Sequence, residues 1–216
     1  MQAFTGVRAV LFDVDGTLLD TREYIFRAAE HTLGAFKLPV PPRTEIARAV
    51  GTPLDGFYRM LAGEKEVDVS ALMKEHHEFQ KRNLALSVPF PGVAETLAAL
   101  SERGMVLGGV TNRRSGTAVP TLAAADLMRF MATVVCADEV PNPKPHPDHI
   151  HATLSRMSVS AENAVMVGDS SVDVAAGKNA GTKTVRATYG FHTDELHEPE
   201  PDAFIADIRE LLALLA

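Results

Sequence analysis

Two carboxylates, separated by one residue, follow an apolar run near the start of the chain. Asp13 and Asp15 follow residues 10–12 and precede Gly16. An apolar run that ends in acids and a glycine is typical of a buried parallel strand, and open α/β sheets bind ligands at the carboxyl edge of such strands. Two acids placed there can divide a reaction between a nucleophile that also binds metal and a proton carrier. Taken alone, the motif is equally typical of a capped turn.

Polar residues also end two later apolar runs. Thr111 and Asn112 follow one of them, and their side chains and backbone N–H groups can bind phosphate oxygens, although Thr-Asn also commonly starts turns. Asp169 follows the other, and Asp173 stands where the next helix should open. Carboxylates at these positions suit Mg²⁺, while Asp173 could also simply compensate the helix dipole. The carboxyl ends of parallel strands would bring these residues together.

Lys144 lies between two prolines, Pro143 and Pro145. A lysine is usually a solvated surface residue. Each proline fixes its own φ and restricts the residue before it, so this lysine has little backbone freedom. Such stiffness suits a positive charge that is aimed at one place.

The composition limits the classes of protein. The chain has 216 residues, of which 46% are apolar, and a formal net charge of −7. These values predict a soluble protein with a substantial core and argue against a broad nucleic-acid surface. The longest apolar runs fall well short of the roughly 20 residues that a membrane span needs. The single cysteine, Cys136, excludes an intramolecular disulfide and fits a cytoplasmic location.

The region after the first motif has helical spacing and no strand pattern. We expect helices over residues 21–37, 44–50, 54–62 and 69–87. In the first of these, Tyr24, Ala28, Leu33 and Phe36 should form one apolar stripe. Some seventy residues exceed an ordinary connection of about 2 to 6 residues. The pattern therefore predicts an inserted helical cap domain over residues 21–89, and a core domain formed by residues 1–20 and 90–216.

From residue 92 onward, helices and strands alternate. We expect strands at 105–111, 133–136, 164–167 and 182–186, and helices at 93–103, 117–127, 147–157, 171–180 and 207–215. This alternation predicts an α/β fold with a doubly wound parallel sheet. Residues 189–202, which are rich in His, Glu and Pro, are expected to form a surface loop.

Residues 13–20, with the sequence DVDGTLLD, resemble the first motif of the haloacid-dehalogenase-like phosphohydrolases. The segments around Thr111, Lys144 and Asp169 resemble the later motifs of that family, in the same order. The resemblance covers essentially the whole chain. The large insertion follows the first motif, so the chain is most similar to the subgroup with a small helical cap.

The resemblance implies an aspartyl-phosphate mechanism. Asp13 would be the nucleophile, and Asp15 would protonate the leaving oxygen and then deprotonate the water that releases phosphate. Mg²⁺ would be held by Asp13, the backbone carbonyl of Asp15 and Asp169, with Asp173 as a ligand or as the partner of one. A further three residues, Thr111, Asn112 and Lys144, would bind the substrate, the first and last of them holding the phosphoryl oxygens.

Within this family, four segments most resemble phosphoglycolate phosphatases: residues 51–54, 89–93, 110–112 and 201–205. Phosphoglycolate is thus the leading substrate, and a basic cap residue should bind its carboxylate. Arg48 and Arg59 are the candidates, although each is more typical of a solvated helix face. Arg113 departs from the family's usual lysine after Val-Thr-Asn, which keeps the charge and changes the hydrogen-bond geometry.

Other functions stay open. A sugar phosphomutase of the β-phosphoglucomutase type shares the core and cap, but its cap histidine, lysine and arginine fall at Ile25, Val50 and Leu54 here. Other small-cap phosphatases, acting on pyrophosphate, sugar phosphates or nucleotides, are further alternatives, and a non-catalytic regulatory module is a remote one. In each enzymatic case we expect a small phosphorylated metabolite as the partner, no nucleic acid or membrane, and a monomer or homodimer.

Overall fold

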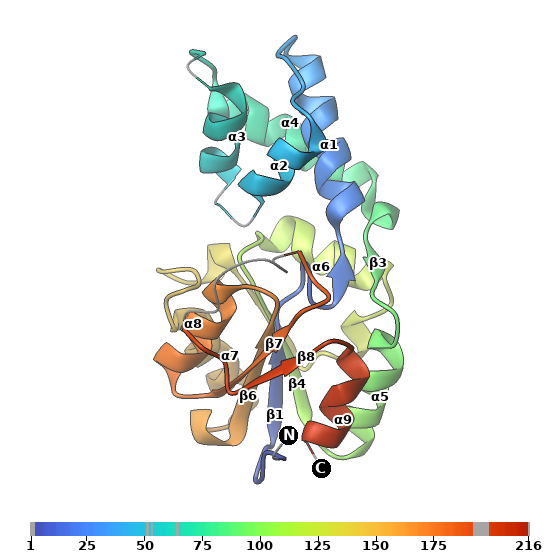
Figure 1. Ribbon diagram of the computed structural model, residues 1–216, viewed down its shortest axis with the longest axis vertical. Coiled ribbons are helices and arrows are strands. Elements are labelled where there is room, and N and C mark those ends of the chain that lie inside the picture. Colours follow the sequence, from blue (N-terminus) through green and yellow to red (C-terminus); the bar gives the residue numbers. More distant parts are fainter. Residues whose placement is uncertain (1–2, 51, 53, 64, 192–198, 216) are drawn as a thin grey trace. The chain divides into compact units, whose positions relative to one another are not determined.

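The computed structural model describes residues 3–50, 52, 54–63, 65–191 and 199–215. The chain divides into two compact units (Figure 1). Unit 1 consists of Met1–Asp20 and Val88–Ala216, and unit 2 of Thr21–Ser87. Among the described residues, no helix is both long and apolar enough to cross a membrane.

Unit 1 is built on a six-stranded parallel sheet with the order β5-β4-β1-β6-β7-β8. Its strands are β1 (Ala9–Phe12), β4 (Val106–Thr111), β5 (Thr133–Cys136), β6 (Ala164–Gly168), β7 (Lys183–Ala187) and β8 (Ala203–Ile205). All four residues of β1 are fully buried, as expected for a central parallel strand. The chain order reverses at β1, which lies between β4 and β6, and ligands of such sheets bind at this switch point.

Helices cover both faces of this sheet, because successive side chains of a strand point to opposite faces. The flanking helices are α5 (Val93–Glu102), α6 (Ser115–Ala124), α7 (Asp148–Met157), α8 (Ser171–Ala180) and α9 (Leu211–Leu214). Val10 and Phe12 pack in the cluster that includes α5, α6 and α9, whereas Ala9 and Leu11 pack in the cluster that includes α7 and α8. The predicted α/β fold with a doubly wound parallel sheet is confirmed.

Unit 2 is helical. It contains α1 (Arg22–Ala35), α2 (Arg43–Ala49), α3 (Leu54–Ala62), α4 (Val69–Arg82) and the 3₁₀ helix Leu84–Leu86. A small apolar cluster holds these helices together, with Leu33, Ile46, Phe57 and Leu72 among its buried members. The four predicted helices are confirmed. The predicted stripe of the first helix is wrong at Phe36, which is 41% exposed because α1 ends at Ala35.

Short elements account for the other differences from the prediction. The strand β8 and the antiparallel pair β2 (Leu19–Asp20) and β3 (Val88–Pro89) were not expected. The predicted last helix over 207–215 is instead the 3₁₀ helix Ile208–Glu210 followed by the single turn α9. Three further 3₁₀ helices are Met128–Phe130, Ala137–Glu139 and Ala161–Asn163. Strands of two or three residues are too short to show the alternation by which strands are recognised.

Candidate active site

The predicted site residues follow adjacent strands at one edge of the sheet. In the sheet register, Phe12 of β1 lies beside Gly109 of β4 and Val167 of β6. Asp13 follows Phe12 directly, Thr111 lies two residues beyond Gly109, and Asp169 lies two residues beyond Val167. The strands β1, β4 and β6 are neighbours in the sheet (Figure 1). Three segments far apart in the sequence therefore deliver polar residues to neighbouring carboxyl ends.

Lys144 is the centre of this polar cluster. Its Nζ donates to Asp13 Oδ1 at 2.6 Å, to Asp173 Oδ1 at 2.6 Å and to the carbonyl oxygen of Val110 at 2.9 Å. The residue is only 6% exposed, and its three ammonium protons match these three acceptors. Lys144 is therefore a buried charge in a fixed position.

Three carboxylates form a group that could hold a cation. One oxygen from each of Asp13, Asp169 and Asp173 lies within 4.8 Å of the others, and all three residues are buried. The second oxygen of Asp173, Oδ2, already accepts from the hydroxyl of Ser170 at 2.6 Å and from its backbone N–H at 3.1 Å. Asp173 is thus anchored through both oxygens, so it is poorly placed to turn toward a new ligand.

Electrostatics in this cluster favour the binding of a cation. Burial and the carboxylates of Asp173 and Asp169 hold the pKa of Asp13 well above its usual range, although Lys144 opposes them. Burial alone would lower the pKa of Lys144, but Asp13 and Asp173 outweigh it and raise this pKa, so the ammonium stays charged. One ammonium among three carboxylates leaves an excess of negative charge. A divalent cation fits this donor set, because hard cations prefer carboxylate oxygens and would offset that excess.

Asp169 is enclosed by two glycines. A Cβ added to Gly16, whose φ is +85°, would lie 2.4 Å from Asp169 Oδ2, and one added to Gly190 would lie 2.3 Å from Asp169 Cβ. The backbone N–H of Phe191 also donates to Asp169 Oδ2 at 2.7 Å. Side chains at either glycine would displace the carboxylate, so these positions need a residue without a Cβ.

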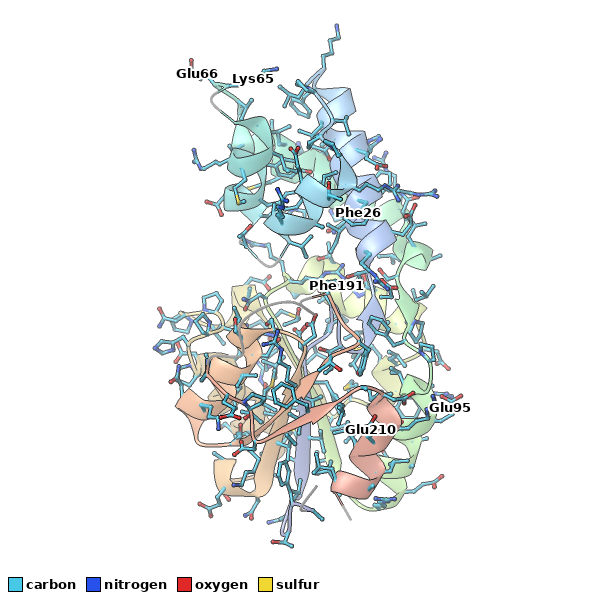
Figure 2. The ribbon with its side chains drawn as sticks, viewed as in Figure 1. Phe26, Lys65, Glu66, Glu95, Phe191 and Glu210 are labelled. Atoms are coloured by element: carbon cyan, nitrogen blue, oxygen red, sulfur yellow. The ribbon has the colours of Figure 1, made fainter. Side chains whose placement is uncertain are left out.

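The segment after β7 was missing from the predicted site. Residues 189–191 were expected to begin a surface loop, but Tyr189 is partly buried against the core of unit 1 and donates its hydroxyl proton to the Thr17 carbonyl at 3.0 Å. Figure 2 labels Phe191 in this segment. Most of the remaining predicted loop lies outside the described residues. The sequence signal was a Tyr-Gly pair shortly after a strand, which is weak by itself.

Two side chains hold the backbone of Lys144. Asn112 Nδ2 donates to the Lys144 carbonyl, and the Lys144 N–H donates to Asn112 Oδ1, both at 3.0 Å. The same N–H donates to His149 Nδ1 at 3.1 Å. Burial, together with the charge of Lys144, lowers the pKa of His149 to about 4, which keeps its ring a neutral acceptor. Asn112 was predicted to bind substrate, which stays a prediction, and its amide group holds the backbone of Lys144.

Thr111 and Asp15 complete the group. Thr111 is 1% exposed, and its Oγ1 accepts from the backbone N–H of Arg113 at 3.1 Å. The Asp15 side chain lies closer to solvent, and its Oδ1 accepts from Arg113 Nη1 at 3.2 Å. Unit 1 therefore brings together all seven residues predicted for the site.

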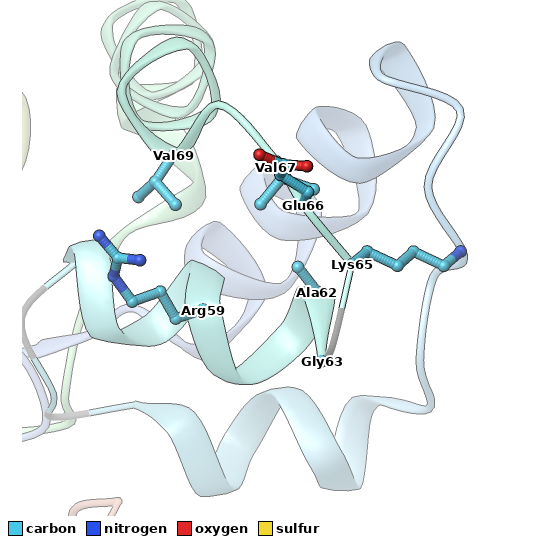
Figure 3. Close-up of a pocket in the computed structure, with 7 residues that line it drawn as sticks. All are labelled: Arg59, Ala62, Gly63, Lys65, Glu66, Val67 and Val69. Atoms are coloured by element: carbon cyan, nitrogen blue, oxygen red, sulfur yellow. The ribbon is translucent and has the colours of Figure 1, made fainter.

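The two arginines predicted to bind a substrate carboxylate lie in unit 2, in α2 and α3. Arg48 and Arg59 are both exposed. Arg59 lines a hollow of about 260 Å³ within unit 2, and Figure 3 shows Lys65 on its rim, extended away from the other labelled residues. Two positions of the predicted segment 51–54, Gly51 and Pro53, lie outside the described residues.

The fold and this cluster define a class of protein: an α/β enzyme whose acids, gathered at the carboxyl edge of a parallel sheet, surround a buried lysine. The chain belongs to the haloacid dehalogenase-like hydrolase family, whose sequence profile matches residues 10–187. The family predicted from the motifs is thus confirmed.

Proteins similar over almost the whole chain carry phosphatase names. Pyrophosphatase PpaX of Halalkalibacterium halodurans is 31% identical over 210 residues, which cover 97% of each chain. Phosphoglycolate phosphatase of Escherichia coli K12 is 30% identical over 239 residues, covering 100% of this chain and 95% of that one. A crystal structure described as a predicted phosphoglycolate phosphatase from Haemophilus somnus superposes with a TM-score of 0.91 at 25% identity. The superposition covers 98% of this chain and 99% of that one. The prediction of an enzyme is confirmed: the chain is a hydrolase of this family.

Proposed function

We propose that this hydrolase is a Mg²⁺-dependent phosphatase that cleaves a small phosphomonoester through a phosphoaspartate at Asp13. The observation that carries the proposal is the contact between a buried carboxylate and a buried ammonium, Asp13 Oδ1 to Lys144 Nζ at 2.6 Å, within a group of three acids. Support also comes from the family and from the names of its full-length relatives.

In this proposal Asp13 attacks phosphorus with a carboxylate oxygen, and the bond from phosphorus to the ester oxygen breaks. A carboxylate needs no base to activate it, so its difficulty is the repulsion between two anions. Lys144 reduces that repulsion, and Thr111 offers a hydroxyl to the phosphoryl oxygens. Mg²⁺, held by Asp13, Asp169 and the Asp15 carbonyl with Asp173 beside them, would supply further positive charge that polarises the phosphoryl group.

Asp15 transfers the protons. It gives a proton to the departing alcohol oxygen in the first step and takes one from the water that attacks the phosphoaspartate in the second. That attack breaks the bond between phosphorus and the Asp13 oxygen, which restores the carboxylate and releases inorganic phosphate. The greater exposure of Asp15, beside three buried acids, supports this division of labour.

We propose phosphoglycolate as the substrate, with pyrophosphate as the second candidate because PpaX is 31% identical. The roles of residues 21–89 as a cap and of Arg48 and Arg59 in binding a carboxylate stay predictions. Initial rates with phosphoglycolate, pyrophosphate, sugar phosphates and nucleotides, each with Mg²⁺ and with EDTA, separate the candidates. Phosphoglycolate among the poorest substrates would exclude the first one.

The nucleophile is tested with Asp13→Asn. This variant should lose about 10⁴-fold or more in kcat, because the amide oxygen cannot form the phosphoenzyme. It should keep the thermal midpoint of the wild type, since an amide relieves repulsion in the cluster. Asp126→Asn is the matched control, because the Asp126 side chain is 72% exposed. Wild-type-like turnover by Asp13→Asn, with no phosphoenzyme trapped from the wild type by acid quench, would contradict the mechanism.

A further inference from the structure

Arg113 connects the proton-transferring carboxylate to a helix. Its Nη1 donates to Asp15 Oδ1 at 3.2 Å, and its Nη2 donates to Thr121 Oγ1 on α6 at 3.0 Å. The Thr121 hydroxyl in turn donates to the Thr117 carbonyl at 2.7 Å, which fixes the acceptor. The Arg113 side chain is only 14% exposed. The guanidinium is therefore held from two sides and cannot follow Asp15 freely.

The pair differs from an ordinary surface ion pair. Surface pairs contribute little because both partners are mobile and hydrated. Here one partner is anchored, and the other is the carboxylate to which the proposed function gives both proton transfers. Within the described part of the chain, the hydrogen bond from Arg113 reaches Oδ1, while Oδ2 of Asp15 has no hydrogen bond with the protein. One oxygen is held, and the other is left for the proton.

We infer that Arg113 is a positioning residue for Asp15, which orients the carboxylate so that its free oxygen meets the leaving group and later the water. This inference rests on the proposed function. It uses the planar fork of arginine, which can bind two acceptors in fixed directions, whereas a lysine offers one point charge. Arg113 acts through Asp15 and has no bond to make or break itself.

The inference has a chemical signature. An alcohol leaves poorly as an alkoxide, so cleavage of an alkyl phosphate depends on the acid, whereas p-nitrophenolate leaves readily without a proton. A change that misplaces Asp15 should therefore slow alkyl phosphates more than p-nitrophenyl phosphate. A change that merely loosens the fold or weakens phosphate binding should slow both alike.

The experiment compares Arg113→Met, Arg113→Lys and Thr121→Val with the wild type, using kcat/KM over a series of aryl and alkyl phosphates. Arg113→Met should lose ~10²-fold with alkyl phosphates and less than about tenfold with p-nitrophenyl phosphate. Arg113→Lys keeps the charge but lacks the planar fork, so its kcat/KM with alkyl phosphates should lie between those of the wild type and Arg113→Met. Thr121→Val removes the second anchor while keeping Arg113, and should show a smaller loss with the same dependence on the leaving group.

A double-mutant comparison tests whether Arg113 acts through Asp15. If Arg113 acts through Asp15, adding Arg113→Met to Asp15→Asn should cause no further loss in the residual p-nitrophenyl phosphate activity, because the carboxylate to be oriented is gone. An equal loss with every leaving group, or a full further loss in the Asp15→Asn background, would overturn the inference. Failure of the proposed function looks different: the wild type itself would then hydrolyse none of these esters.

Discussion

Two clusters of ion pairs with similar distances lie in different surroundings. In unit 1, Lys144 contacts Asp13 and Asp173 at 2.6 Å, and all three side chains are buried. In unit 2, Arg43 contacts Glu23 and Glu30 at 2.7 Å, and its side chain is 46% exposed. The ion pairs of the exposed cluster contribute little to stability because water and salt screen their attraction. The charges of the buried cluster have lost their hydration, so they depend on their partners in the protein.

The clusters also differ in charge balance. In unit 2, Arg27 joins Arg43 against Glu23 and Glu30, so two cations meet two anions. In unit 1, one ammonium meets three buried carboxylates. A buried excess of charge destabilises a fold, so such a cluster indicates a functional site rather than a contribution to stability. This difference predicts that changes in the buried cluster have large effects and changes in the exposed cluster small ones.

The largest effect should come from Lys144→Met. Removing the ammonium takes the buried cation away from Asp13 and Asp173, which should cost about 3–5 kcal/mol in the free energy of unfolding in EDTA. Turnover should fall about 10²- to 10³-fold as phosphoryl stabilisation is lost. The stability loss should shrink as pH falls, because the burial and repulsion that already raise the pKa of Asp13 then allow the cluster to protonate. Urea unfolding of Lys144→Met and of the wild type at two pH values measures this stability loss and its dependence on pH.

Lys178→Met is the matched control. Lys178 is 38% exposed, and its Nζ lies 3.5 Å from Asp202 Oδ2, so its removal should barely change stability or turnover. Equal destabilisation by the two variants would mean that burial does not separate these lysines energetically.

The positions of the candidate site residues were easier to predict from the sequence than the contacts that support them. Asp13, Thr111 and Asp169 could be placed because each follows a buried strand with a clear apolar run, and parallel strands share a carboxyl edge. Lys144 was identifiable from its two prolines. These signals lie in residue types and local spacing, which sequence displays directly.

What the sequence did not predict depends on contacts between distant backbones. The Phe191 N–H that holds Asp169 belongs to a group that every residue except proline carries, and the closeness of Gly190 is a matter of three-dimensional approach. Asn112 was identified, but the direction of its amide toward the Lys144 backbone was not. Such partners depend on packing that no local pattern encodes.

A second prediction concerns the support that residues 190 and 191 give to Asp169. Gly190→Ala should displace Asp169, because the new Cβ would lie 2.3 Å from the Asp169 Cβ. Loss of support for a metal-binding carboxylate typically costs about 10- to 100-fold in metal affinity or activity. The measurement is the Mg²⁺ concentration that gives half-maximal turnover. Gly34→Ala in α1 is the control, since nothing lies within 4 Å of its Cβ. An unchanged Mg²⁺ dependence in Gly190→Ala would show that the 189–191 segment is irrelevant to the site.

A third prediction concerns His149, the neutral neighbour of the buried charges. Its pKa is lowered from 6.5 to about 4 in the folded protein, so below pH 6.5 the unfolded chain binds a proton that the folded one refuses. The stability due to the neutral ring is therefore full above pH 6.5 and falls as the pH drops toward 4, by about 2 kcal/mol between pH 7 and 5. His149→Asn should flatten that slope, and exposed His151→Asn should leave it unchanged. Parallel slopes for all three proteins in urea unfolding would contradict the prediction.

The smallest effect should come from Arg43→Met in the exposed cluster. Its guanidinium also lies 5.3 Å from the centre of the Phe26 ring, labelled in Figure 2, yet nearly half of the side chain is exposed to solvent. Methionine retains apolar contact with that ring, so the thermal midpoint should hardly move, and any difference should vanish in high salt. A salt-independent loss as large as that of Lys144→Met would mean that burial does not decide what an ion cluster contributes in this protein.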